Sequence, residues 1–220
     1  VEGFETFNVT SIGDSNTINA IVTGGDLETL NVAGKENLSI SSLDASVATI
    51  NAGDMTGDLS VSAGTVAVGE VDTNFAATTG SGGDSVNLSG IQSGPANSDN
   101  ATITVTTNAG DDSVTLPGLS GDMDSDFAGT LDLDGGDGED TLSLNIGQTT
   151  ANDQVDFQTL DDVTFSNFEA LRLTINGGNA SEFDASVLDG LASVVLAPGV
   201  DNQDFELSNA GTTDRITVAS

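Results

Sequence analysis

The chain of 220 residues contains no cysteine, histidine, tryptophan or tyrosine, and only Lys35, Arg172 and Arg215 oppose its 35 acidic residues. Without cysteine no disulfide can form. Without histidine the ordinary catalytic triads are excluded. Without a basic patch, binding to nucleic acid or to an anionic membrane surface is excluded. No run of 18 apolar residues is present, so we expect no segment to insert into a bilayer.

The formal net charge of −32 is the strongest compositional signal. A chain this acidic repels itself unless cations screen or bind it, which indicates salt-rich surroundings, divalent cations, or both. High charge is also typical of disorder. Disorder is disfavoured here because valine, isoleucine, leucine and phenylalanine alternate regularly with polar residues along the chain.

A five-residue pattern recurs along the chain. The segment Asp84–Leu88 (DSVNL) returns at Asp112–Leu116 (DSVTL) and at Asp140–Leu144 (DTLSL), 28 residues apart each time. Looser copies precede and follow. The first apolar residues of the nine units lie at positions 7, 30, 59, 86, 114, 142, 171, 194 and 216, so the gaps range from 22 to 29 residues.

This pattern predicts the fold. Alternation of polar and apolar residues is typical of a strand, and repetition every 20–50 residues is typical of a stacked solenoid. We therefore predict an all-β fold, a right-handed parallel β-helix of about nine coils with 22–29 residues each, forming one continuous segment over residues 1–220. A β-sandwich is the alternative, but it does not account for the near-equal gaps. Because Val1 begins inside a repeat unit, we expect the chain to be a piece of a longer protein.

Two finer predictions concern side chains and local structure. One apolar residue from each successive unit should stack on a single interior ladder, comprising Leu59, Val86, Val114, Leu142 and Leu171. The best local candidate for a helix is Glu182–Leu191, whose alternative is another turn and strand.

The segment Gly135–Ser143 (GGDGEDTLS) fits the calcium nonapeptide Gly-Gly-x-Gly-x-Asp-x-U-x at every fixed position. Glycines allow the backbone to turn so that carbonyl oxygens point inward, the aspartate adds a charged oxygen, and the apolar residue anchors the following strand. Calcium takes 6–8 such hard oxygen ligands. Partial copies of the motif lie at 79–87 and 107–115, so these turns are concentrated in residues 79–144.

At these residues the chain resembles the RTX repeat family, and in particular the RTX-bearing bacterial surface-layer and adhesin proteins. The run Ser42–Ala63 and the segments Gly3–Val9 and Asn167–Leu173 are similar to the β-solenoid repeats of those proteins. The resemblance implies one to three Ca²⁺ ions shared between glycine-rich turns. It implicates the following residues, through the aspartate side chains and the turn carbonyls: Gly135, Gly136, Asp137 and Asp140, with Gly110 and Asp112, and with Gly80, Gly82 and Asp84. The alternative is that these turns are solvated corners.

A second group of acids, Asp122, Asp124 and Asp126, resembles the start of an EF-hand loop. Phe127 stands where that loop requires glycine, and Leu133 stands where it requires glutamate, so an EF-hand is disfavoured. A loose calcium site and a solvated acidic loop both stay open for this segment.

We expect no enzymatic activity. The polysaccharide lyases that share parallel β-helices use basic residues that are scarce here, and the phenylalanines occupy core-type positions rather than sugar-stacking ones. Threonines at Thr102–Thr107 raise an ice-binding interpretation, but an ordinary exposed strand face is favoured. The predicted function is a calcium-stabilised structural protein of an extracellular surface layer or sheath at the cell surface. Its partners are copies of itself and divalent cations. The alternative is a rigid calcium-dependent spacer of a large secreted RTX adhesin.

Overall fold

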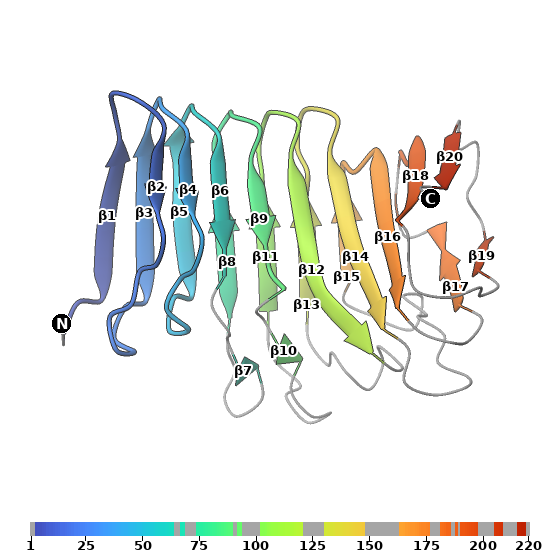
Figure 1. The fold of residues 1–220 in the computed structure, drawn as a ribbon, viewed down its shortest axis with the longest axis horizontal. Coiled ribbons are helices and arrows are strands. Elements are labelled where there is room, and N and C mark those ends of the chain that lie inside the picture. The colour runs from blue at the N-terminus through green and yellow to red at the C-terminus, as the bar shows by residue number, and fades with distance from the viewer. Residues whose placement is uncertain are drawn as a thin grey trace.

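The computed structural model describes residues 3–63, 67–68, 74–89, 92–93, 102–120, 130–147, 163–176, 181–185, 188, 190–197, 205–208 and 215–218. Two long parallel sheets, one of seven strands and one of nine, enclose a single hydrophobic core (Figure 1). The fold is therefore the parallel β-solenoid that the repeat predicts. Within the described residues, no helix is long and apolar enough to cross a membrane.

In the described residues, each of the first seven turns of the solenoid contributes one strand to each long sheet. The seven-stranded sheet contains, in spatial order, β1 (Thr6–Ser11), β3 (Thr29–Gly34), β5 (Thr49–Met55), β8 (Phe75–Thr78), β11 (Thr102–Thr106), β13 (Thr130–Asp134) and β15 (Val163–Ser166). The nine-stranded sheet contains β2 (Asn16–Ile18), β4 (Leu38–Ile40), β6 (Leu59–Ser62), β9 (Ser85–Asn87), β12 (Ser113–Ser120), β14 (Thr141–Gly147), β16 (Ala170–Asn176), β18 (Ser193–Ala197) and β20 (Arg215–Val218). Two small sheets pair β7 (Ala67–Val68) with β10 (Gln92–Ser93), and β17 (Ser181–Asp184) with β19 (Phe205–Ser208).

The predicted count of nine equivalent coils is wrong. The units that begin at Phe7 and Leu30 lie in β1 and β3 of the seven-stranded sheet, whereas the later units lie in the nine-stranded sheet. In the described residues, seven turns contribute a strand to both sheets, and β18 and β20 extend only the nine-stranded sheet. The sequence pattern does not distinguish the units of the seven-stranded sheet from those of the nine-stranded sheet, because the strands of both sheets bury alternate residues.

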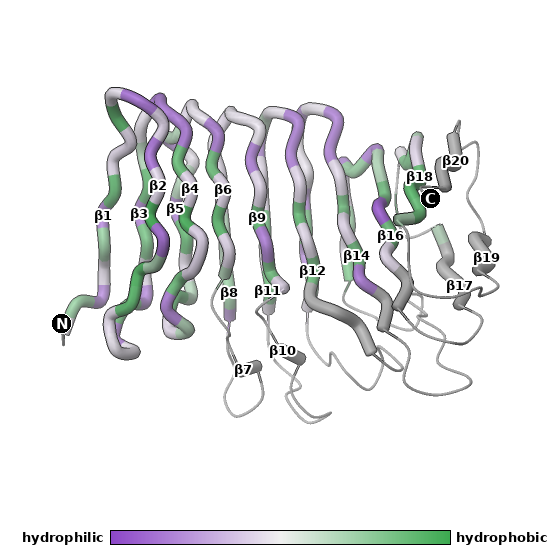
Figure 2. The backbone as a smooth tube through the Cα atoms, in the orientation of Figure 1, coloured by the Kyte–Doolittle hydropathy of each residue, from purple (hydrophilic) through white to green (hydrophobic). Residues whose placement is uncertain are grey.

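The interior ladder of the nine-stranded sheet is shifted by two residues at one point. Val86, Val114, Leu142 and Leu171 pair in register and are at most 1% exposed, as predicted. The prediction for Leu59 is wrong, because Val61 is the residue that pairs with Val86 and Leu59 pairs with Leu38. Green apolar and purple or white polar segments alternate along the strands in Figure 2, as expected for strands with one buried face.

The outer face of the seven-stranded sheet carries an amide row at its N-terminal end. The Asn31 side-chain amide donates to Asn8 Oδ1 over 2.8 Å, and the Asn51 amide donates to Asn31 Oδ1 over 2.9 Å. Thr78 and Thr106 continue this register in the next strands. The predicted helix near Glu182 is wrong; its alternative holds, because β17 (Ser181–Asp184) is a strand.

Candidate metal centre

The connections from the seven-stranded to the nine-stranded sheet stack on one another along one long edge of the solenoid, at the top in Figure 1. We call these connections the upper corners; the central ones span residues 79–84, 107–112 and 135–140. Main-chain hydrogen bonds tie one upper corner to the next. Gly110 N–H donates to the Asp137 carbonyl over 2.9 Å, and Asp137 N–H donates to the Asn108 carbonyl over 2.7 Å.

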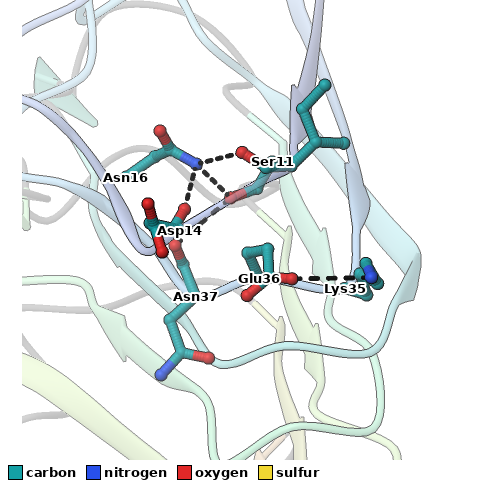
Figure 3. Close-up of polar contacts among 7 residues, drawn as sticks. Ser11, Asp14, Asn16, Lys35, Glu36 and Asn37 are labelled. Carbon is teal, nitrogen blue, oxygen red and sulfur yellow. Dashed lines mark hydrogen bonds and ion pairs between the residues drawn. The ribbon is translucent and has the colours of Figure 1, made fainter.

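The first upper corner is closed by neutral groups (Figure 3). The Asn16 amide nitrogen donates to Ser11 Oγ over 3.0 Å and to the carbonyls of Ile12 and Asp14 over 3.3 and 2.7 Å. The buried Ser11 hydroxyl donates onward to the Asn37 carbonyl over 3.2 Å. This corner therefore satisfies its polar groups without an inward-facing carboxylate.

The central upper corners place carboxylates inside the solenoid. Leu59 N–H donates to Asp84 Oδ1 over 2.7 Å, Asp84 N–H to Asp112 Oδ1 over 2.6 Å, and Asp112 N–H to Asp140 Oδ1 over 2.8 Å. Asp140 N–H donates in turn to Glu169 Oε2 over 2.9 Å. We call Asp84, Asp112, Asp140 and Glu169 the acid ladder. Its three aspartates are at most 2% exposed.

The acid ladder takes over a role that the main chain performs elsewhere. At the two N-terminal interfaces, the equivalent N–H groups of Asn16 and Leu38 donate to the carbonyls of Asn37 and Asp58, each over 2.8 Å. From Leu59 onward a side-chain carboxylate of the next turn replaces that carbonyl as the acceptor. The aspartates recur every 28 residues because each one pairs with the N–H group of the turn before it.

Two oxygens of the acid ladder have no partner. Asp84 Oδ2 accepts the Gly80 N–H over 3.1 Å, so both Asp84 oxygens are bonded. Asp112 Oδ2 and Asp140 Oδ2 are buried and accept no hydrogen bond. Because an unsatisfied buried oxygen is unfavourable, each such atom indicates a missing partner.

The protonation equilibria of the ladder reflect this burial. Burial is the main cause that raises the pKa of Asp112 and of Asp140 to about 6; the neighbouring carboxylates act in the same direction, and the N–H groups of Asp84 and Asp112 that donate to them act in the opposite direction. Burial also raises the pKa of Asp84. At neutral pH the ladder therefore holds negative charge in an environment that disfavours it.

Among the side chains that the structure describes, none brings a positive charge to this ladder. In the described part of the chain, the only ion pair joins Lys35 Nζ to Glu36 Oε1 over 3.7 Å, near the N-terminal end of the row of corners (Figure 3). Arg172 lies on the exposed face of β16 and pairs in register with Ser143, away from the core. A cation from solution would neutralise the ladder without protonating it.

The carbonyl groups implied as ligands are partly engaged. The Gly135 carbonyl accepts the buried Thr107 hydroxyl over 2.6 Å, and the Asp137 carbonyl accepts the Gly110 N–H. Each carbonyl oxygen has a second lone pair that such a bond leaves available. Gly80 donates its N–H group to Asp84, and its carbonyl accepts the Ala109 N–H over 3.3 Å.

Two glycines of the motif are explained by stacking. Gly110 and Gly136 have positive φ values of 135° and 89°, which favour glycine. A Cβ at Gly110 would collide with the Gly82 carbonyl, and a Cβ at Gly136 would collide with the Asn108 carbonyl. These glycines therefore allow adjacent turns to approach closely, whether or not a metal is bound.

The acids of the second predicted site, Asp122, Asp124 and Asp126, lie outside the described residues. Within the described ranges, no three Asp, Glu, His or Cys side chains gather closely enough to hold a metal by themselves. A cation at Asp112 and Asp140 would need turn carbonyls or water to complete its coordination.

Sequence reasoning missed two members of this arrangement. Glu169 ends the acid ladder, and its position 29 residues after Asp140 is the signal that could have identified it. Thr107 is fully buried and bonds the next turn, but a threonine in a turn has no distinctive pattern. Comparison of the whole chain with protein-family models, curated proteins and solved structures finds no match.

Proposed function

We propose that this chain is a calcium-stabilised β-solenoid segment of an extracellular surface-layer or sheath protein, a structural component that assembles with copies of itself at the cell surface. The observation that carries the proposal is the pair of unpartnered buried oxygens, Asp112 Oδ2 and Asp140 Oδ2, on successive turns of the acid ladder. The fit to the calcium nonapeptide at Gly135–Ser143 supports the same cation.

Calcium suits these residues for chemical reasons. It prefers hard oxygen ligands from carboxylates, carbonyls and water, and it tolerates irregular geometry. The carboxylates of Asp112 and Asp140 would hold it, and its charge would offset the repulsion that burial intensifies. Its binding free energy would add to the stability of the folded state, because the unfolded chain does not hold these groups together.

The fold supports the proposed mechanical role. Each turn contacts mainly its neighbours, so the stability of the stack is approximately a sum of turn and interface terms. Strands β1, β3, β8, β11 and β15 and all strands of the nine-stranded sheet contain no acidic residue, which leaves the negative charge largely at the corners and connections. Divalent cations between acidic corners of neighbouring rods would permit lateral assembly that monovalent screening alone does not provide.

The test measures calcium binding and stability on residues 1–220. We expect calorimetry to detect one to three sites and chelation to lower the melting temperature. At a free calcium concentration 100 times the Kd, one site stabilises the fold by about 2.7 kcal/mol. The double variant Asp112→Asn/Asp140→Asn should lose this gain.

The matched control is Asp54→Asn/Asp132→Asn, which removes the same charge from two exposed positions and should retain the gain. Identical melting in excess chelator and in calcium would contradict the calcium assignment. Equal losses in both double variants would show that calcium acts on overall charge rather than at the ladder.

Assembly is tested separately by light scattering and electron microscopy, with calcium and sodium compared at matched ionic strength. Periodic arrays that form only in calcium support the surface-layer function. A chain that binds calcium but stays dispersed in every condition favours the alternative of a spacer in a large secreted adhesin.

A further inference from the structure

The outer face of the seven-stranded sheet is hollowed over its first four strands. The hollow encloses about 560 Å³ and lies over β1, β3, β5 and β8, which are neighbours in this sheet (Figure 1). We call it the outer hollow; the residues that line it include Asn8, Asn31, Asn51, Gly53, Asp54 and Thr78. A strand preceding β1 would extend the sheet in its own plane, so it would not cover this face of β3, β5 and β8.

A β-bulge in β5 shapes the outer hollow. The pairing of β3 with β5 shifts between Asn31 and Ala33, where β5 has one residue more than β3. Two consecutive residues of β5, Gly53 and Asp54, are therefore both exposed, whereas a regular strand exposes alternate residues. Bulges re-aim side chains in this way and are common next to functional sites.

The glycine of this bulge is not explained by the backbone. Gly110 and Gly136 have positive φ values and touch the next turn, but Gly53 has neither feature. A Cβ at Gly53 would lie 3.7 Å from Thr78 Cγ2 and 4.0 Å from the Thr79 carbonyl oxygen, which are ordinary contacts. Glycine weakens a strand and often marks a place where a ligand approaches closely. The missing side chain keeps the outer hollow open.

The outer hollow also holds hydrogen-bonding groups that the fold leaves free. The amide row crosses it, and the bonds from Asn31 to Asn8 and from Asn51 to Asn31 fix the amide groups in place. Each amide nitrogen keeps a second N–H group. Within the described residues, Asn51 Oδ1 and the Asp54 carboxylate accept no hydrogen bond. Donors and acceptors therefore lie side by side on a preorganised surface.

We propose that the outer hollow binds a neutral saccharide whose units follow one another along the rod axis. Sugar hydroxyls both donate and accept, which matches the mixture of amide, hydroxyl and carboxylate groups in the lining. Neighbouring strands lie about 4.7–4.9 Å apart, close to the length of one pyranose unit in a polysaccharide, so successive asparagines would face successive sugar units. The volume is typical of ligand pockets, which enclose about 300–1,000 Å³.

Charge and composition narrow the class of ligand. Among the described residues that line the outer hollow, Asp54 is the one charged side chain, and the whole chain carries −32, so a uronate or a phosphate would be repelled. An ammonium group would use Asp54 and leave the amide row without a partner. The lining holds no aromatic ring for a sugar to stack on, so binding rests on hydrogen bonds at the surface and should be weak for a single sugar unit. The site adds a ligand to the proposed structural role and requires neither calcium nor assembly.

Titration of the chain of residues 1–220, followed by NMR, tests the proposal. The probes are the methyl glycosides of glucose, galactose, mannose and N-acetylglucosamine, their linear trisaccharides, and glucuronate. At least one neutral trisaccharide should shift the side-chain amide signals of Asn31 and Asn51, and bind at least tenfold more tightly than its single unit. Glucuronate should leave these signals unchanged. The proposal is overturned if no neutral saccharide shifts them, or if glucuronate binds as tightly as glucose.

Two pairs of variants locate the binding. Gly53→Leu fills the outer hollow and should weaken trisaccharide binding at least tenfold without lowering the melting temperature, whereas Ser60→Leu on the exposed face of β6 should leave binding unchanged. Asp54→Ala removes an acceptor in the hollow and should weaken binding, whereas Asp132→Ala, exposed on the same sheet, should not. Equal effects within both pairs would place the saccharide elsewhere and overturn the site. The aspartate pair keeps the test valid if Gly53→Leu folds poorly.

The same titrations in excess chelator separate this inference from the proposed function. Saccharide binding that is equal in chelator and in calcium supports the outer hollow, and it does so even if calorimetry finds no calcium site. Binding that appears only in calcium would assign the saccharide to cation-bridged carboxylates and overturn the site, while leaving the calcium-stabilised structural role intact.

Discussion

The N-terminal and central upper corners fill the same interior position with opposite chemistry. In the second and third turns the corner is packed by Leu38, Met55 and Leu59, which are at most 2% exposed. In the next turns Asp84 and Asp112 stand at the position of Leu59, and their carboxylates accept the N–H groups of the preceding turns. One backbone path therefore accommodates either an apolar corner or an acidic one.

The difference changes what stabilises each region. A buried leucine contributes about 1.5–3 kcal/mol whatever the pH or ion content. A buried carboxylate oxygen without a partner costs about 1–3 kcal/mol or more. The N-terminal turns should therefore be stable under all conditions, whereas the central turns should respond to protons and cations.

The largest expected effect comes from placing an acidic side chain in one of the apolar upper corners. Leu59→Asp places a carboxylate in an apolar corner where the Leu38 N–H is already bonded to the Asp58 carbonyl. Leu59→Ala should cost about 2–5 kcal/mol through the cavity it leaves. Leu59→Asp should cost at least about 2 kcal/mol more, because its charge is buried without a donor. Chemical denaturation measures both, and equal losses would show that this corner can already accept a carboxylate.

The next prediction compares the same substitution at two aspartates of the acid ladder. Asp84→Asn should destabilise the chain by about 1–3 kcal/mol, because both Asp84 oxygens accept N–H groups and an amide can accept through only one atom. Asp140→Asn keeps the acceptor for Asp112 N–H and replaces an unpartnered oxygen. In chelator at pH 7 it should therefore stabilise the chain, while removing part of the gain from calcium. If both variants are less stable than the wild-type chain in chelator, the assignment of Asp140 Oδ2 as an unpartnered oxygen is contradicted.

Much of this arrangement was readable from the sequence. The 28-residue spacing identified Asp84, Asp112 and Asp140 as equivalent, and alternation identified Val86, Val114 and Leu142 as one ladder. The register at Leu59 was not readable from spacing. The first apolar residue of each unit was aligned with Leu59, but Leu59 occupies the position of the repeating aspartate, and Asp58 bonds Asn37 on the exposed side. Whether a side chain points in or out depends on the turn geometry, which the pattern does not encode.

The pH dependence should separate the two regions in the absence of calcium. The pKa of Asp112 and of Asp140 is raised from 3.8 to about 6 by burial, so the folded state binds protons more tightly than the unfolded state. Their favourable contribution is complete below about pH 4 and is lost as the pH rises through about 6. The melting temperature in chelator should therefore fall between pH 4.5 and pH 7.

Calcium should reverse this trend, because its carboxylate ligands must be ionised. The double variant Asp112→Asn/Asp140→Asn should show a flatter profile in chelator than Asp54→Asn/Asp132→Asn, which retains both buried acids. Profiles of equal slope in the two variants would assign the pH effect to overall charge.

The smallest expected effect concerns the amide row, which belongs only to the N-terminal turns. Asn31 donates to Asn8 and accepts from Asn51, whereas threonines occupy the same register in β8 and β11. Asn31→Thr removes both bonds but retains a residue that this face accepts elsewhere. We expect the free energy of unfolding to fall by about 0.5–1 kcal/mol, because both bonds lie at the surface where water competes.

The reverse change, Thr78→Asn, should recover a fraction of that amount by extending the row beyond Asn51. Neither effect should depend on calcium or on pH between 4.5 and 7, since no ionisable group takes part. Denaturation curves in chelator and in calcium provide the measurement, and a loss that appears in only one of the two would show that the N-terminal turns are coupled to the acid ladder.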